Sequence, residues 1–193
     1  MLKDKKILIT GIANKFSIAT GIAQRMSKNG AELAFAYQNE RLLKKIKPIA
    51  DDLGVKTLIE CDVASDKSIE QTFSQLKDEW GTLDGIVHSI GFAPSDQLDG
   101  DFTEVTTREG FQIAHDISSY SFTALAKGAL PILSEKAALL TLTYLGSIQS
   151  LPNYNVMGLA KASLEANTRF LACLLYTSPS PRDRTRSRMP SSA

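Results

Sequence analysis

Short runs of Ile, Val and Leu alternate along most of the chain with longer amphipathic stretches, and this alternation constrains the fold more than any other feature. The apolar runs predict strands at residues 6–11, 32–37, 57–61, 85–89 and 138–143. The amphipathic stretches predict helices at residues 17–29, 40–53, 67–80, 108–129 and 155–172. Because strands this apolar are buried on both faces, we expect an α/β fold, a doubly wound parallel sheet of the Rossmann type.

The composition excludes several classes of function. The formal net charge of +1 argues against nucleic acid or an anionic membrane as the main partner. No apolar run reaches the roughly 18 residues that span a bilayer, and the run from Ile7 to Ile9 is too short for a secretory signal. Cys61 and Cys173 have no paired spacing that predicts a disulfide framework or a metal site, and Cys61 is interpreted as a small buried apolar residue. We expect a cytoplasmic protein.

The end of the first predicted strand is a candidate phosphate site. Gly11 closes this strand, and a helix is predicted to begin at Ser17 and Ile18, with Gly21 one turn further on. Two glycines of the usual dinucleotide fingerprint are missing from this spacing. A glycine still permits close approach of the backbone to a ligand, and the free N–H groups at a helix start can hold a pyrophosphate. The alternative is a purely structural turn.

The residues after the second and third strands are candidates for holding the adenosine part of a dinucleotide. Gln38 takes the place of the usual acidic residue, and its amide can bond a ribose hydroxyl without repelling a 2′-phosphate. We expect NADH, while Arg41 keeps NADPH open as an alternative. Asp62 could accept from the adenine amino group with Val63 packing on the ring, or Asp62 could instead cap the following helix.

Tyr154 and Lys161 form the candidate catalytic pair. They lie about two helical turns apart, so both can share one face if Tyr154 stands at the helix entrance. A tyrosine hydroxyl can donate to a substrate oxygen as negative charge develops, and a nearby ammonium strengthens that donation. The alternative is a packing tyrosine with an unrelated surface lysine. Neither His88 nor His115 is assigned as an acid or a base, and His88 is expected to complete the strand-end turn beside the cofactor.

Three segments around this pair carry a resemblance to a known family: His-Ser-Ile-Gly-Phe-Ala at 88–93, Tyr-Leu-Gly at 144–146 and Pro-Asn-Tyr-Asn-Val-Met-Gly-Leu-Ala-Lys-Ala at 152–162. Together they resemble bacterial enoyl-[acyl-carrier-protein] reductases of the short-chain dehydrogenase/reductase superfamily, from about Lys3 to Ala172. Most short-chain reductases have Tyr-x3-Lys, but that register places Met157 here. The Tyr-x6-Lys spacing with an upstream Tyr144 is typical of the enoyl reductases.

The resemblance implies NADH-dependent reduction of a trans-2-enoyl thioester on acyl carrier protein, in fatty acid biosynthesis. It implies that Tyr154 bonds the thioester carbonyl oxygen, that Lys161 binds the nicotinamide ribose and that Tyr144 shapes the acyl site. The implied cofactor residues are Gly11, Ser17, Ile18, Gln38, Asp62, Val63, Ile90 and Lys161, and the backbone of Ala93 is implied to touch substrate. It also implies a homotetramer formed by the helices at 108–129 and 155–172. The alternatives are a 3-ketoacyl reductase, disfavoured by Met157, and a catalytically silent dinucleotide-binding protein or fragment.

The alternating pattern ends after Ala172, so we expect a reductase domain at residues 1–172 and a disordered, non-native tail at 173–193. The tail is rich in Arg, Ser and Pro. Residues 173–183 resemble one reading frame of a transposase adapter used to prepare DNA sequencing libraries, so we expect the open reading frame to leave the gene near Ala172. The family resemblance then implies a sheet that is incomplete at its C-terminal end and a chain that is poorly stable and inactive as written.

Overall fold

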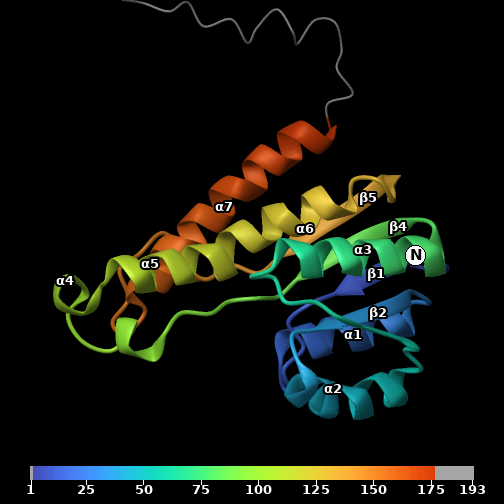
Figure 1. Cartoon of the computed structure of the whole chain (residues 1–193), viewed down its shortest axis with the longest axis horizontal. Helices are drawn as coiled ribbons and strands as arrows, with labels where there is room; N and C mark the ends of the chain where they lie inside the picture. Colours follow the sequence, from blue (N-terminus) through green and yellow to red (C-terminus); the bar gives the residue numbers. More distant parts are fainter. Residues whose placement is uncertain (1, 177–193) are drawn as a thin grey trace, which may run out of the picture.

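The computed structural model describes residues 2–176, and the predicted doubly wound α/β fold is confirmed. Five parallel strands form one sheet in the order β3-β2-β1-β4-β5 (Figure 1). The strands are β1 Lys6–Ile9, β2 Glu32–Tyr37, β3 Thr57–Glu60, β4 Leu83–His88 and β5 Leu133–Thr141. The strand order reverses between β1 and β4, and at such a switch point the carboxyl ends of the strands leave a crevice for a ligand.

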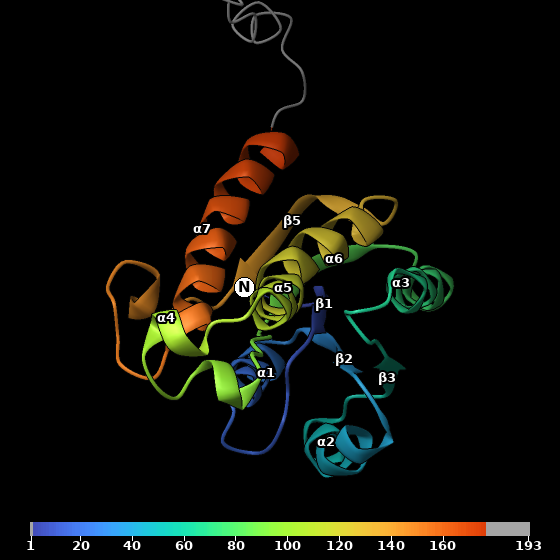
Figure 2. The same cartoon turned by 60° about the vertical axis from the view of Figure 1, so that its left-hand side comes forward.

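Helices cover both faces of the sheet, as the apolar strands predict. They are α1 Ile18–Lys28, α2 Glu40–Leu53, α3 Asp66–Trp80, α4 Phe102–Val105, α5 Arg108–His115, α6 Ser121–Ala129 and α7 Asn155–Tyr176. α1 and α2 pack on one face, α3 and α6 pack on the other, and α7 lies beside α5 and α6 (Figure 2). Within the described residues, no helix is both long enough and apolar enough to cross a membrane.

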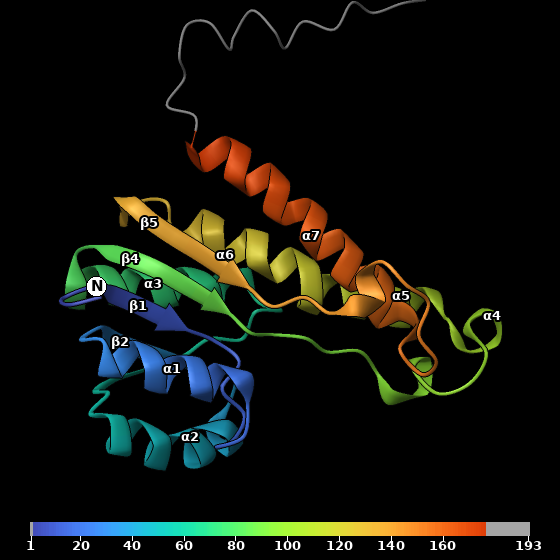
Figure 3. The ribbon, with the colours of Figure 1, turned by 180° about the vertical axis from the view of Figure 1, so that it is seen from behind.

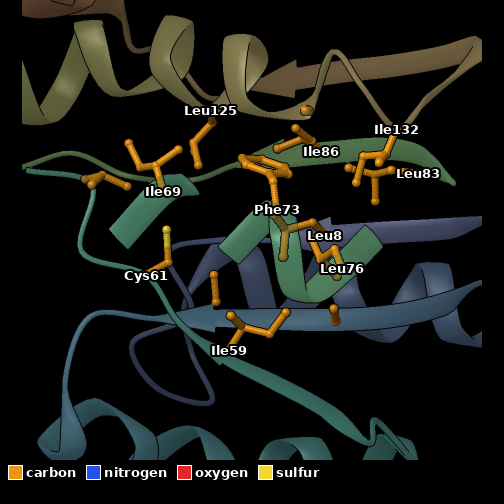
Figure 4. Packing of buried hydrophobic residues seen from close by; sticks show 14 of the residues in the cluster. Leu8, Ile59, Cys61, Ile69, Phe73, Leu76, Leu83, Ile86, Leu125 and Ile132 are labelled. Atoms are coloured by element: carbon orange, nitrogen blue, oxygen red, sulfur yellow. The ribbon is translucent and has the colours of Figure 1, made fainter. Parts of the chain in front are cut away.

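The larger buried cluster lies between the sheet and helices α3 and α6 (Figure 4). Phe73 of α3 and Leu125 of α6 meet Leu8 and Ile86 of the central strands, and each side chain is at most 5% exposed. Full burial of such a side chain contributes about 1.5–3 kcal/mol, so this contact fixes both helices on the sheet. Cys61 belongs to the same cluster, which confirms its interpretation as a small buried apolar residue.

Local signals set the helix ends that follow β2 and β3. The Asn39 side chain accepts a hydrogen bond from the backbone N–H of Leu42 at the start of α2. Ser65 does the same for Ser68 at the start of α3. Because each cap follows within a few residues of a strand end, the short segments between strand and cap are held at the carboxyl edge of the sheet.

The predicted bounds hold best in the first half of the chain. β2 and α2 match the prediction residue for residue, whereas α1 is one residue shorter than predicted at each end and α3 begins one residue earlier. In the second half β5 begins at Leu133 rather than at residue 138. Its early part was missed because Glu135 and Lys136 are exposed on an edge strand and interrupt the apolar run.

The predicted long helix and long loop also differ from the structure. The helix expected at 108–129 is α5, a π-helical turn at Asp116–Tyr120, and α6. The segment 92–107 contains a 3-10 turn at Ser95–Gln97 and the short α4. α7 continues past its predicted end at Ala172 to Tyr176. The rest of the predicted tail, from residue 177 on, lies outside the described residues.

The two halves of the sheet are covered differently on the face of α1 and α2. Those helices lie over β1, β2 and β3, and their buried cluster reaches β4 through Val87, whereas within residues 2–176 no helix lies over β5 on that face (Figure 3). Leu139 packs into the cluster on the opposite face, so the alternating Ala138 and Leu140 point to the open side. Leu140 is 44% exposed there.

Candidate active site

A pocket of about 630 Å³ opens at the carboxyl ends of the strands, where the strand order places a crevice. Its lining comes from the ends of β1 to β4, from α2, from α5 and from the π-helical turn: Thr10, Gly11, Ile12, Ala13, Ala36, Tyr37, Gln38, Leu42, Cys61, Val63, Ala64, Ser89, Ile90, Gly91, Phe92, Ile113, Asp116 and Ile117. Cofactor sites commonly have volumes of roughly 300–1,000 Å³. The pocket therefore has the size and the position of a cofactor site.

Gly11 makes the floor of this pocket possible. Its φ is +80°, a left-handed conformation that side chains disfavour. A Cβ at this position would lie 1.9 Å from the carbonyl oxygen of Ser89, on the neighbouring strand end. Only glycine therefore fits here without movement of the backbone, and the turn after β1 lies directly against the segment after β4.

Ser17 and Ile18 lie at the start of α1, as predicted, but neither is among the residues that line the 630 Å³ pocket. Ser17 is the N-cap residue, and its hydroxyl donates to the Asn14 carbonyl at 2.8 Å and contacts the Thr20 hydroxyl at 2.9 Å. Ile18 is 68% exposed. These contacts fold the segment before α1 into a compact turn.

Gln38 and Asp62 come together at the ends of β2 and β3. The Gln38 amide donates to the Asp62 carboxylate at 3.4 Å, and the Ala64 backbone N–H donates to the same oxygen at 3.2 Å. Asp62 therefore closes the turn before α3, but the N-cap of that helix is Ser65. Gln38 and Val63 line the pocket, so the polar pair lies at its rim with an apolar side chain beside it.

Tyr154 stands directly before α7, which begins at Asn155, and its ring faces that of Tyr144. The two ring centroids are 5.2 Å apart in an edge-on arrangement. Burial raises the pKa of the Tyr154 hydroxyl, and Tyr144 raises it further, so the hydroxyl stays protonated and can donate. A Cβ on Gly146 would lie 2.3 Å from the Tyr154 ring, so the turn after β5 presses against it.

Lys161 lies on α7, about two helical turns after Tyr154, and is only 7% exposed. Its Nζ donates to the carbonyl oxygens of Leu142, at 2.9 Å, and Ile90, at 3.4 Å. Burial lowers the pKa of this ammonium. Gly91 lies so close that a Cβ there would be 3.4 Å from Nζ, which puts Lys161 directly behind the pocket-lining segment after β4.

The segment after β4 carries two further predicted residues. Ile90 lines the pocket, and Ala93 is partly buried against Ala114, Val156 and Ala160 of α5 and α7. His88 is the last residue of β4 and is fully buried, but it is not among the residues that line the pocket, so its place beside the cofactor stays a prediction. Among the described residues, no group of three or more His, Cys, Asp and Glu side chains could hold a metal ion.

The π-helical turn holds pocket-lining residues that the sequence did not predict. The Ser118 hydroxyl accepts from the backbone N–H of Phe92 and donates to its carbonyl, both at 2.8 Å. Asp116 and Ile117 line the pocket beside Phe92. Such π-helical turns occur often at functional sites, because the extra residue redirects side chains. A run of polar residues inside an otherwise apolar helical stripe is the one sequence feature that marks this turn.

These features define the class: a Rossmann-type protein with a dinucleotide-sized crevice, a Tyr-x6-Lys spacing at the start of α7, and the lysine of that spacing behind the crevice wall. A family model described as Enoyl-(Acyl carrier protein) reductase matches residues 11–178. The chain belongs to this family.

Relatives and solved structures agree with this family. The chain is 58% identical over 171 residues to the enoyl-[acyl-carrier-protein] reductase [NADH] FabI of Escherichia coli K12, and 53% identical to that of Haemophilus influenzae. Each match covers 89% of this chain and 65% of the relative, so the chain spans about two-thirds of the relatives' length. An enoyl-[acyl-carrier-protein] reductase (NADH) from Aquifex aeolicus has a TM-score of 0.88 and 44% identity, over 90% of this chain and 69% of that one. A reductase from Anaplasma phagocytophilum in complex with NAD has a TM-score of 0.87 and 40% identity, over 91% and 66%.

Proposed function

We propose that the protein reduces trans-2-enoyl thioesters on acyl carrier protein with NADH, as a step of fatty acid biosynthesis. The observation that carries this proposal is the pairing of Tyr154 with Tyr144, 5.2 Å apart, beside a buried Lys161 that lies behind the cofactor-sized pocket. The names of the relatives support the same reaction. Met157 is buried with its sulfur 3.6 Å from the Ser118 hydroxyl, and its thioether supplies no hydroxyl for a 3-ketoacyl reductase of the Tyr-x3-Lys type.

The residues around the pocket fit a dinucleotide. Gly11 lets the backbone approach a pyrophosphate, with the N-terminus of α1, Ser17 and Ile18, beside it. At the other end, Gln38 would bond the adenosine ribose, and Asp62, Val63 and Ile90 would hold the remaining parts of the dinucleotide. Because Gln38 carries no charge, NADPH remains an alternative that the binding test must include.

The chain's own groups supply binding and charge stabilisation. When bound, NADH supplies the hydride that adds to the β-carbon of the substrate. The Tyr154 hydroxyl donates to the thioester carbonyl oxygen as negative charge develops, and protonation at the α-carbon completes the reaction. Lys161 has three N–H donors, of which Ile90 and Leu142 receive two, so one is left for the nicotinamide ribose. Tyr144 and the backbone of Ala93 border the acyl chain.

The partner and the assembly belong to the same proposal. Acyl carrier protein would deliver the substrate, and the protein would work in the cytoplasm. α5, the π-helical turn, α6 and α7 lie side by side and carry exposed apolar side chains, including Phe111, Tyr120 and Phe170, at 39%, 47% and 72%. Helices of this kind support a homotetramer built on these surfaces.

The test is loss of NADH absorbance in the presence of a trans-2-enoyl thioester. Tyr154→Phe should slow turnover by about 10²–10³-fold, because one donor to the developing oxyanion is lost. The dissociation constant for NADH should change less than about twofold, since the ring stays in place. Both the chain and a chimera that continues with the remaining third of the E. coli relative should be assayed, because the chain spans 65% of that relative.

Tyr120→Phe is the matched control: Tyr120 ends the π-helical turn and is not among the residues that line the pocket, so loss of its hydroxyl should leave turnover unchanged. Activity on 3-ketoacyl thioesters alone would replace the proposal with the other reductase class. Binding of NADH without turnover, in the chain and in the chimera, would instead assign a silent dinucleotide-binding protein.

A further inference from the structure

His88 is a buried polar residue that the proposed chemistry does not use. Its ring is fully buried at the end of β4, and both nitrogens are bonded. Nδ1 lies 2.8 Å from the Thr141 hydroxyl on β5, and Nε2 lies 2.8 Å from the Ser121 hydroxyl on α6. The Phe122 ring packs beside it, with centroids 5.3 Å apart. The imidazole therefore joins two strands and a helix.

The hydrogen-bond partners fix the tautomer. Ser121 donates its single hydroxyl proton to the Ile117 carbonyl at 2.7 Å, so it can only accept from His88. Nε2 therefore carries the proton, and Nδ1 accepts from the Thr141 hydroxyl. Burial lowers the pKa of His88 to about 3, and the positive charge of Lys161 adds to that shift. The ring is neutral at physiological pH.

The hydrogen bond between the side chains of His88 and Thr141 joins β4 and β5 at their carboxyl ends. The two residues are the final partners in the register of these parallel strands. Leu142, whose carbonyl holds Lys161 at 2.9 Å, is the next residue after Thr141. Ile90, the other acceptor of Lys161, follows His88 by two residues. Both carbonyls that hold the ammonium therefore belong to residues one or two positions after the hydrogen-bonded pair His88 and Thr141.

We propose that His88 is a positioning residue for Lys161: its bond to Thr141 fixes the spacing of the two strand ends whose carbonyls hold the ammonium. Without this bond, the strand ends can separate and the carbonyls of Ile90 and Leu142 no longer face one point. What Lys161 then does for a bound dinucleotide rests on the proposed function, but its placement does not.

Two amide substitutions separate the two bonds of the imidazole. In His88→Asn the amide oxygen reaches the position of Nδ1 and can accept from Thr141, whereas in His88→Gln the amide reaches only the position of Nε2 and Ser121. Thr141→Val removes the same bond from the other side, and Thr141→Ser restores it. Ser121→Ala is the matched control, because of the two hydrogen bonds of His88 it breaks only the one to α6 and leaves the bond to Thr141 in place.

The primary readout is trace acetylation of Lys161 by acetic anhydride, measured by mass spectrometry relative to Lys5, which bonds Asp84 near the opposite end of the sheet. His88→Gln and Thr141→Val should raise Lys161 labelling by roughly 3- to 10-fold, the effect of losing one hydrogen bond. His88→Asn, Thr141→Ser and Ser121→Ala should stay within about twofold of the original chain. NADH affinity should weaken only in the first two variants, by a similar factor.

Equal labelling of Lys161 in His88→Gln and His88→Asn overturns the inference, because a purely structural histidine would affect both alike. Unchanged labelling in Thr141→Val overturns it as well. If the labelling pattern holds but no form of the chain binds NADH, the positioning of Lys161 stands and the proposed function fails. Melting temperatures of all variants show whether a labelling change merely follows a loss of stability.

Discussion

The two sides of the pocket are built in different ways. On the side of β1, β2 and β3, backbone geometry places the candidate residues: Gly11 turns at a φ of +80°, and Gln38 follows directly from the end of β2. On the side of β4 and β5, hydrogen bonds from side chains hold the candidate residues in place. Ser118 binds both backbone groups of Phe92, and His88 bridges the strands whose carbonyls hold Lys161.

This difference has consequences for how each side can fail. A strand end within a ladder of backbone hydrogen bonds changes position only when the backbone itself is displaced. A segment held by buried side-chain hydrogen bonds can move when a single one is lost, because an unpaired buried group costs about 1–3 kcal/mol. The first side should therefore supply most of the affinity for a dinucleotide, with a smaller share from Lys161, and the second side should mainly control whether a bound dinucleotide is used.

A pair of glycine substitutions tests this division with the largest expected effect. In Gly11→Ala the new Cβ meets the backbone of Ser89 at 1.9 Å, so we expect a loss of about 3 kcal/mol or more in stability and at least about 100-fold in NADH affinity. In Gly146→Ala the Cβ meets the Tyr154 ring at 2.3 Å, and a ring can move. NADH affinity should hold, while turnover falls about 100-fold because the hydroxyl is displaced. Calorimetric titration and a turnover assay measure both.

Gly54→Ala is the control for backbone strain alone. Gly54 has a φ of +68°, similar to that of Gly11, but a Cβ there meets nothing within 4 Å. Its substitution should cost about 1 kcal/mol of stability and leave NADH affinity unchanged. If Gly146→Ala weakened NADH binding as much as Gly11→Ala, the two sides would not be separable in this way.

The same contrast explains which parts of the fold and of the candidate site the sequence predicts. β2 and α2 follow from local features, an apolar run, the Asn39 cap and Gly54, and Gln38 lines the pocket as predicted. Asp116 and Ile117 were not predicted to line it, because the extra residue of a π-helical turn redirects side chains without changing the local composition.

The side of β4 and β5, which carries the proposed catalytic pair, was predicted from the Tyr-x6-Lys spacing and a family resemblance rather than from contacts between residues. The seven positions from Tyr154 to Lys161 place both residues on or beside α7, as the structure shows. The carbonyls that hold Lys161 come from Ile90 and Leu142, which are 71 and 19 residues away. No local sequence pattern encodes such distant partners. The hydrogen bonds of Lys161 therefore become visible only in the folded structure.

The buried histidine should make the second side sensitive to acid. The folded-state pKa of His88 is about 3, below the ordinary value of 6.5, so below pH 6.5 the unfolded chain takes up a proton that the folded chain does not. This contribution to stability is therefore complete above pH 6.5 and is lost as the pH falls toward 3. We expect a loss of about 2 kcal/mol by pH 5. Urea unfolding across this range measures it.

His88→Asn should flatten this dependence, since asparagine does not titrate. The chain has one other histidine, His115, which is partly exposed and stacks on Phe111. His115→Asn is therefore the matched control and should retain the acid sensitivity. Equal flattening by both substitutions would contradict the assignment of the effect to the bridge between β4 and β5.

The smallest expected effect concerns Asp84, which joins the two sides at the end of the sheet away from the pocket. Its carboxylate accepts from the Lys5 ammonium at 2.8 Å, the Lys6 backbone N–H at 3.1 Å and the Ser134 hydroxyl at 2.9 Å. Burial alone would raise the pKa of Asp84, but these hydrogen bonds outweigh it and lower the pKa. The stabilisation is therefore present above about pH 4, the unfolded value, and is lost as the pH falls further.

Asp84→Asn should lower the free energy of unfolding by about 1 kcal/mol at neutral pH, since the amide retains some hydrogen bonds and loses the ion pair. The deficit should shrink below about pH 4, where the original carboxyl is itself protonated. NADH affinity should not change, because Asp84 lies at the amino end of β4 and the pocket at the carboxyl end. A clear change in affinity would mean that the two sides communicate through the strands, and that the division between binding and use of the dinucleotide is one of degree.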